Sequence, residues 1–343
     1  MTHRFPIKEI ALQAGISTAT VDRALNGRAN VSPQTQARVA AAIKELEGQE
    51  VQLSARGRRM FVDVVVEAPR RFTAEIRRAM EAELPGLAPA VMRPRFEFHE
   101  EMSEAQTVSI LRRIATRGTQ GVCLKARDLP GIRDAIAMLA GKNIPVVTIF
   151  TDLPGSQRLA YVGLDNTNAG RTAAYLIAAM RQEPLGGVLM TKSNDLFHGE
   201  AERAAAFVQE LARRCPDLKL IDASGGAGLS RSTGEQVSAA LSRGQDIRAV
   251  YSMGGGNAAI LETLDRLNIR PEVFVAHDLD AENLVLLQAE RLSVVLHHDL
   301  ATDMRAAARA IMVYHKLAPD GDAQKLSDVA IITPMNLPHT LDS

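Results

Sequence analysis

The fold of the N-terminal part of this chain is decided by residues 7–46, which read IKEIALQAGISTATVDRALNGRANVSPQTQARVAAAIKEL. Apolar residues recur there at the three- and four-residue spacing of one helical face, before Gly15 and again after Ser17. Gly15 can adopt a positive φ, which suits a tight turn after a helix. Ser17 is a good N-cap for a second helix, and Ser32 followed by Pro33 predicts the start of a third. This is the order of a helix-turn-helix DNA reader with a supporting helix.

The charge of the chain is unevenly distributed. Among all 343 residues, 40 Lys and Arg balance 40 Asp and Glu. Residues 1–60 hold nine of the basic and five of the acidic side chains, so this part carries +4 and the remainder −4. A small basic head on a nearly neutral body suggests contact with a polyanion.

The head, residues 1–47, resembles the N-terminal domain of the LacI/GalR (lactose-repressor) family of bacterial transcription regulators. The features that carry the resemblance keep an unbroken register; they are Ala11, Ala14-Gly15-Ile16-Ser17, Thr20-Val21, Arg23, Asn26-Gly27, Val31-Ser32 and Thr35. The resemblance implies double-stranded operator DNA as a partner. A three-helix cap that does not contact DNA is the alternative.

The resemblance also implies roles for single residues. Thr18 and Ala19 occupy the positions that face base edges in the major groove, where small side chains favour contact with thymine methyl groups. Arg23 lies one turn further on the same face and is the candidate for a bidentate contact to guanine. Four polar residues suit phosphate contacts: Ser17, Thr20, Asn26 and Ser32. For Thr20, the alternative role is a purely local hydrogen bond within the helix.

A short polar segment, residues 48–60, joins head and body. In the family a hinge helix forms here on DNA and inserts an apolar side chain, usually Leu, into the minor groove. Ala55 and Arg56 match the usual Ala-Arg pair, whereas Arg58 stands in place of the Leu. Leu53 or Arg58 would therefore occupy the minor groove, and a plain flexible linker is the alternative.

The body, residues 61–343, alternates short apolar runs with amphipathic stretches in βα units of about 25–30 residues. Predicted strands include 61–67 and 95–99. There are too many strands for one open sheet, so we predict an α/β body of two lobes, each a parallel sheet flanked by helices. The expected lobes are 61–160 plus 292–320, and 161–291 plus 321–335.

The body resembles the ribose-binding-protein-like (type I periplasmic) ligand domain that follows the head in this family. The segments that carry this resemblance occur in the family's order and are Val162-Gly163-Leu164-Asp165-Asn166 with Ala169-Gly170, Glu202-Arg203-Ala204-Ala205-Ala206-Phe207 and Val273-Phe274-Val275-Ala276-His277-Asp278. The resemblance implies that a small-molecule effector binds between the lobes.

Residues just beyond strand ends are the pocket candidates, because ligands of open α/β sheets bind at the carboxyl ends of strands. Arg203 offers a rigid fork of donors, Asp278 can accept two hydroxyl hydrogens, and Phe72 can stack on a sugar ring. A surface or capping role is the alternative for each member of the set, which is Phe72, Asp165, Asn166, Arg203, Asn257, Asp278, His297 and His298.

Other classes of protein receive little support. Gly254, Gly256 and Ala259 only faintly resemble a phosphate-binding loop, and no acidic ribose partner follows at the expected spacing. Adjacent His297 and His298 point to opposite faces of a strand, so we expect no metal, and we expect no other cofactor. Two distant cysteines and an N-terminus without an apolar run favour the cytoplasm. No apolar stretch is long enough to span a membrane.

We therefore expect a transcriptional regulator that is not an enzyme: a repressor, acting as a homodimer, whose operator affinity a sugar or polyol controls. A purine or other effector and a tetramer remain open. The rival interpretations are a ligand-binding receptor without a DNA role and an α/β enzyme fused to a DNA-binding head.

Overall fold

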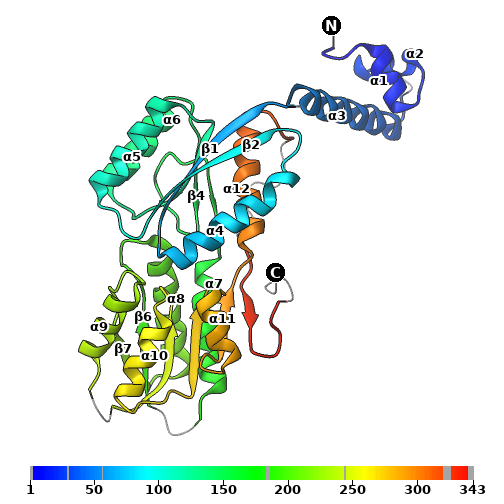
Figure 1. Cartoon of the computed structure of the whole chain (residues 1–343). Coiled ribbons are helices and arrows are strands. Elements are labelled where there is room, and N and C mark those ends of the chain that lie inside the picture. The colour runs from blue at the N-terminus through cyan, green and yellow to red at the C-terminus, as the bar shows by residue number, and fades with distance from the viewer. Residues whose placement is uncertain are drawn as a thin grey trace.

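The computed structural model describes residues 3–28, 31–55, 57–182, 186–242, 245–319 and 326–338, without the side chains of residues 50–55. It confirms the predicted fold class. A helical head is followed by two α/β lobes stacked end to end, and the head lies beyond the first lobe (Figure 1).

The head consists of α1 (Ile7–Ala14), α2 (Thr18–Leu25) and α3 (Pro33–Ala55). The predicted turn is present, because Gly15 adopts φ 62° and the Oγ of Ser17 accepts a hydrogen bond from the Thr20 N–H at 3.1 Å. Ser32 likewise caps α3 through the Thr35 N–H. The helices enclose a core of their own, formed by Phe5, Ile10, Ala11, Ala14, Val21, Val39 and Ala42.

The segment between head and body is largely helical, where a separate polar link was predicted. α3 continues past Gly48 to Ala55, and β1 begins at Arg59. One Gly costs a helix only about 1 kcal/mol, which the surrounding Glu, Gln and Leu residues can offset through their high helix propensity. Arg56 and the side chains of Leu53 and Ala55 lie outside the described part, so their DNA contacts stay predictions.

The first lobe is a parallel sheet in the order β2-β1-β3-β4-β5. The helices α4 and α12 pack on one face of the sheet through one apolar core, and α5 and α6 pack on the other face through a second. The elements are β1 (Arg59–Glu67), α4 (Arg70–Glu83), the 3₁₀ turn η1 (Leu84–Gly86), β2 (Val91–His99), α5 (Glu104–Arg117), β3 (Gly121–Lys125), α6 (Pro130–Ala140), β4 (Val146–Ile149), β5 (Ala160–Val162) and α12 (Leu300–Tyr314).

The second lobe is a six-stranded sheet in the order β11-β10-β9-β8-β6-β7, with β11 antiparallel. α7 and α8 cover one face, and α9, α10 and α11 cover the other. The elements are α7 (Asn166–Met180), β6 (Gly187–Thr191), α8 (His198–Arg214), β7 (Leu220–Asp222), α9 (Ser230–Ala240), β8 (Ile247–Ser252), α10 (Asn257–Arg266), β9 (Val273–His277), α11 (Ala281–Gln288), β10 (Val294–His297) and β11 (Ala330–Ile332).

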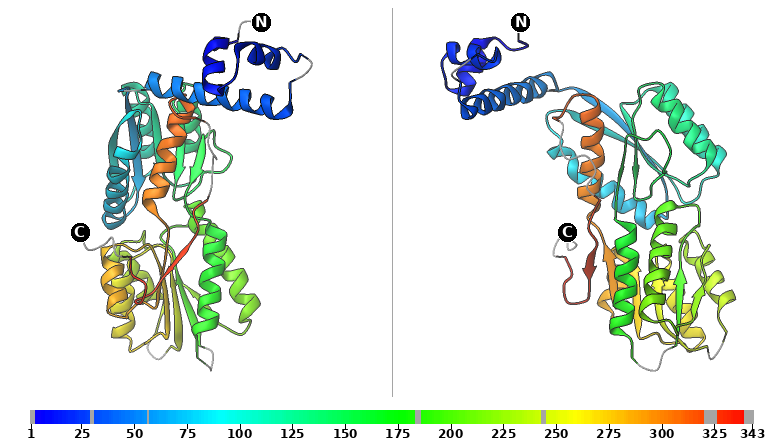
Figure 2. Two further views of the ribbon diagram at one scale, coloured as in Figure 1. Left: turned by 90° about the vertical axis from the view of Figure 1, so that its right-hand side faces the viewer. Right: turned by 180° about the vertical axis from the view of Figure 1, so that it is seen from behind.

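The chain passes between the lobes after β5, after β10 and before β11 (Figure 2). β10 corrects the expected lobe boundaries: it falls within 292–320, assigned above to the first lobe, yet it pairs with β9 in the second. The physical reason is its fully apolar Val294–Leu296 run, which is buried only as a continuation of that sheet. Two of the passages lie side by side, since the Ser327 N–H donates to the Gly163 carbonyl.

Candidate functional site

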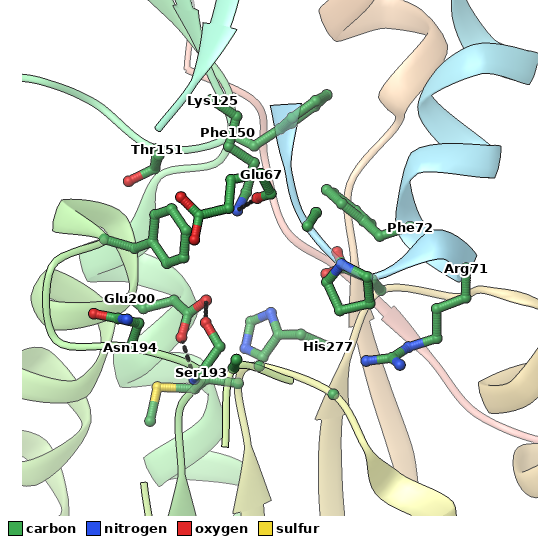
Figure 3. Close-up of a pocket in the computed structure, with 18 of the residues that line it drawn as sticks. Glu67, Arg71, Phe72, Lys125, Phe150, Thr151, Ser193, Asn194, Glu200 and His277 are labelled. Carbon is green, nitrogen blue, oxygen red and sulfur yellow. Dashed lines mark hydrogen bonds between the residues drawn. The ribbon is translucent and has the colours of Figure 1, made fainter. Parts of the chain in front are cut away.

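The two lobes face each other across a cleft of about 860 Å³, a volume that includes its open mouth. In both sheets the parallel strands follow the same 2-1-3-4-5 order, whose topological switch point lies between the first and third strands. The switch points β1/β3 and β6/β8 open into this cleft (Figure 3). Its charged and hydrogen-bonding side chains include Glu67, Arg71, Lys125, Arg127, Ser193, Glu200, Arg203, His277, Asp278, Asp280, Asn283 and His298.

Four of the predicted pocket residues line the cleft: Phe72, Arg203, Asp278 and His298. The Phe72 ring packs edge-on against Phe150, with ring centroids 5.4 Å apart. An apolar wall is thereby available to the face of a flat or cyclic ligand.

Arg203 is buried in α8 at the second-lobe wall. Its Nε and Nη2 donate to the Asn166 Oδ1 at 3.1 and 2.8 Å. Asn166 is not among the residues that line the cleft and holds the Arg203 guanidinium from behind, so its own ligand contact stays a prediction. A guanidinium held on one edge in this way leaves its remaining donors in a fixed direction.

Asp278 and His298 meet at the carboxyl ends of β9 and β10. Asp278 adopts φ 63°, a conformation that non-glycine residues rarely take outside functional or tightly turned sites. The His298 Nε2 lies 3.7 Å from the Asp278 carboxylate, and its Nδ1 forms a 2.6 Å hydrogen bond to Asp303 on α12. His298 therefore connects the cleft to a helix of the first lobe.

Three further predicted residues are not among those that line the cleft, and their ligand contacts stay predictions. Asp165 caps α7 by accepting from the Asn168 N–H at 2.9 Å. Asn257 is buried and donates to the Asn283 Oδ1 at 2.7 Å, so it supports a cleft residue from behind. The His297 Nδ1 accepts from the Leu279 N–H at 3.3 Å beside the cleft.

A charged group at the strand ends of the first lobe was not predicted from the sequence. Glu67 ends β1 and Lys125 ends β3. The Lys125 Nζ donates to the Glu67 carbonyl at 2.9 Å and lies 3.8 Å above the Phe197 ring of the second lobe. Burial lowers the pKa of Lys125, and the nearby carboxylates of Glu200 and Glu67 oppose that shift. The Arg127 Nε donates to the Glu67 Oε1 at 2.8 Å.

The second lobe also holds residues that were missed. Glu200 accepts from both the N–H and the Oγ of Ser193 at 2.6 Å. His277 bonds the Tyr251 hydroxyl at 2.8 Å through its Nε2. Burial, with Arg203 and His298 nearby, keeps the pKa of His277 well below its usual value. Glu67, Lys125 and His277 are the last residues of their strands, so the carboxyl-end rule could have found them.

Arg71 of α4 joins the lobes across the mouth of the cleft. Its Nη2 donates to the Gly228 carbonyl at 2.7 Å, and its Nε lies 3.1 Å from the Asp280 carboxylate. Burial raises the pKa of Asp280 to about 6, although Arg71 and the Asn283 N–H work in the opposite direction. These contacts hold the lobes in the closed arrangement seen here.

The head presents the predicted DNA-contact residues on and around α2. Ser17, Thr18, Ala19, Arg23 and Asn26 are exposed, and Thr20 is half-buried. The Arg23 Nε rests on the Ala19 carbonyl at 3.2 Å, a weak local contact that a base edge can replace. Ser32 and Arg58 are also exposed. These DNA roles remain predictions, because the geometry establishes only that the side chains are accessible.

Among the described residues, no group of three or more His, Cys, Asp or Glu could hold a metal ion. Within the same ranges, no helix has the length and apolar character needed to cross a membrane.

Residues 71–317 match the family model of the periplasmic binding protein domain, which defines the class of the body as a two-lobed ligand-binding protein. Residues 6–47 match the model of the lacI family of bacterial regulatory proteins. The chain belongs to the periplasmic binding protein domain family, and its head is similar to the lacI family of bacterial regulatory proteins.

A curated relative is the HTH-type transcriptional regulator AglR of Rhizobium meliloti (strain 1021), 28% identical over 179 residues. The match spans 50% of this chain and 48% of the relative, so the chain covers about half the length of that protein.

Solved structures resemble the body in fold. A glucose-galactose binding protein, GanP, from Geobacillus stearothermophilus has a TM-score of 0.72 at 18% identity, over 82% of this chain and 99% of its own. A solute binding protein from Agrobacterium vitis, solved with α-D-tagatopyranose, gives 0.70 at 14%, over 81% and 95%. A LacI regulator from Bacteroides fragilis gives 0.68 at 12%, over 82% and 98%.

Proposed function

We propose that the protein is a cytoplasmic transcriptional repressor whose head binds operator DNA and whose cleft binds a neutral sugar or polyol. The observation that carries the proposal is the union, in one chain, of an accessible helix-turn-helix with a two-lobed polar cleft. The protein has no catalytic role in this proposal. Its regulatory relative AglR supports the DNA-binding part.

The charges of the cleft favour a neutral effector. Arg127 pairs with Glu67, and Arg71 pairs with Asp280. The remaining lining charges also nearly cancel, being Lys125 and Arg203 against Glu100, Glu200 and Asp278. An ionic ligand would meet as much repulsion as attraction, whereas hydroxyl groups can both donate to carboxylates and accept from Arg and Lys. Fold relatives named for glucose-galactose binding or solved with tagatose agree with this chemistry.

Regulation follows from lobe closure. An effector held by both lobes stabilises the closed form and shifts the population toward it. β1 transmits the change, because it starts at Arg59 next to α3 and ends at Glu67 in the cleft. In a homodimer two such bodies set the separation of two heads on a pseudo-palindromic operator.

Arg203→Ala tests the effector part of the proposal. Neutral sugars that raise the melting temperature of the wild-type protein should bind the variant at least tenfold more weakly, because a buried charge-assisted donor is lost. The matched control is Arg214→Ala on the same helix, whose guanidinium pairs with Glu210 outside the cleft. Equal sugar affinity in the two variants would contradict the assignment of the cleft.

The DNA part is tested with duplexes that the full-length protein selects from a random-sequence pool. Deleting residues 1–60 should abolish binding to these duplexes and leave sugar binding intact. Undiminished DNA affinity would favour a receptor without a DNA role. Conversion of the bound sugar into a product would favour an enzyme.

A further inference from the structure

The cleft contains two buried polar atoms for which the described residues provide no partner, one in each lobe. Glu67 is 2% exposed, and its Oε1 is occupied by the Arg127 guanidinium. Its Oε2 has no hydrogen-bond partner in the described part of the chain. The ammonium of Lys125 does not fill that role, because its hydrogen bond goes to the backbone carbonyl of Glu67. A buried carboxylate oxygen without a donor is costly, so a donor from the cleft occupant is expected there.

The second atom is the Nδ1 of His277, a residue 3% exposed at the end of β9. The Nε2 of the ring is bonded to the Tyr251 hydroxyl, whereas the Nδ1 has no partner among the residues that the structure describes. Figure 3 shows the Glu67 carboxylate and the His277 ring on opposite sides of the same open space. Both residues therefore line the same cleft, one from each lobe, and face a single occupant of it.

We propose that the effector donates a hydroxyl hydrogen bond to the Glu67 Oε2 and places a second hydroxyl at the His277 Nδ1, so that these two residues determine its specificity. This inference rests on the proposed sugar or polyol effector. It specifies the two hydroxyl groups of the effector that the protein recognises. A hydroxyl suits both positions, because it donates to the carboxylate and can either donate to or accept from the imidazole nitrogen.

The same geometry excludes charged groups at the Glu67 end. A phosphate or carboxylate there would face an anion that can only accept hydrogen bonds, and like charges at contact distance repel. An ammonium group would face the cations of Lys125 and Arg127 on the same wall. The site thus selects sugars with a free hydroxyl at that position and rejects their phosphates and uronic acids.

The inference is tested by measuring melting temperature and affinity for matched ligands in the full-length protein. The neutral probes are D-glucose, D-galactose, D-allose, D-tagatose and myo-inositol, and the anionic probes are glucose 1-phosphate, glucose 6-phosphate and glucuronate. At least one neutral probe should stabilise the wild-type protein, and every anionic probe should bind at least tenfold more weakly.

Glu67→Gln should lower the ratio of neutral to anionic ligand affinity at least tenfold, because the amide can donate as well as accept and carries no charge. Glu97→Gln is the matched control, since Glu97 lies on β2 away from the cleft and pairs with Arg113 of α5. His277→Asn should weaken binding of the neutral ligand about tenfold without changing the ratio of neutral to anionic affinity.

The outcomes separate the two proposals. If a neutral sugar binds but its phosphate binds equally well, or if Glu67→Gln leaves the affinity ratio unchanged, the specificity assignment is wrong and the sugar effector stands. If no neutral probe stabilises the wild-type protein, the proposed sugar effector fails, and this inference fails with it.

Discussion

The head and the cleft build their binding surfaces in opposite ways. The head places six of its seven DNA-contact candidates within ten consecutive residues, 17–26, on one short helix and its caps. The cleft gathers its polar residues from Glu67 to His298, at the ends of strands in two sheets. In the head, a local pattern therefore nearly determines the surface. In the cleft, the surface exists only after both sheets have formed and the lobes have met.

Because the head has a core of its own, we predict that the head can be unfolded while the body that forms the cleft stays folded. Ile10 is 0% exposed at the centre of the small head core. Ile10→Ala should cost about 2–5 kcal/mol, which a domain of this size cannot readily absorb. Calorimetry should show loss of the head transition, with DNA binding abolished and sugar binding by the cleft retained.

Leu12→Ala is the matched control for this prediction. Leu12 lies on the same helix and is 85% exposed, so its truncation should change stability by no more than about 0.5 kcal/mol. If Ile10→Ala unfolds head and body in one transition, the two regions do not fold independently.

A second prediction concerns the closed cleft and its dependence on pH. Burial raises the pKa of Asp280 in the folded protein to about 6, above its ordinary value of 3.8. The folded state therefore binds a proton more tightly than the unfolded state, and the stabilisation from that proton is lost as pH rises from about 4 to 6. Asp280→Asn removes this titration and keeps an N-cap residue on α11.

Urea unfolding of the body should reveal the effect. The free energy of unfolding of the wild-type protein, relative to Asp280→Asn, should fall by roughly 2 kcal/mol between pH 4 and pH 7. A difference that is flat across this range, or that rises with pH, would show that Asp280 does not hold a raised pKa at the interlobe contact.

The same contrast explains how much could be predicted from sequence. Apolar runs and turn residues indicated β1 and the helices of the head, because such signals are local. β2 starts at Val91, earlier than the predicted 95, because pairing with β1 from Arg59 onward extends it. That pairing is a tertiary effect, which sequence periodicity does not encode.

The cleft was predicted in part. Arg203 and Asp278, predicted by family resemblance, line the cleft. Asn166 and Asn257, predicted with them, hold neighbouring side chains in this structure. One residue of difference along a strand or helix decides which side chain faces the cleft, and periodicity cannot fix that register at a strand end. In sequence, a Glu at the end of an apolar strand resembles an ordinary surface boundary, so only the carboxyl-end rule singles out Glu67.

The last prediction tests whether a single side chain of the head determines the preference at a single base pair of the DNA. Arg23→Ala should cost about 1–3 kcal/mol on the selected operator and relax preference at one base pair, because a bidentate guanine contact is lost. Lys44→Ala on α3 removes the same charge from an exposed site elsewhere on the head, so it should weaken all duplexes slightly and equally. Binding to the operator and to single-base variants of it, measured at one salt concentration, separates these cases. A uniform loss for Arg23→Ala on every duplex would make Arg23 a phosphate contact, and sequence reading would then depend on the small side chains of Thr18 and Ala19 and on groove shape.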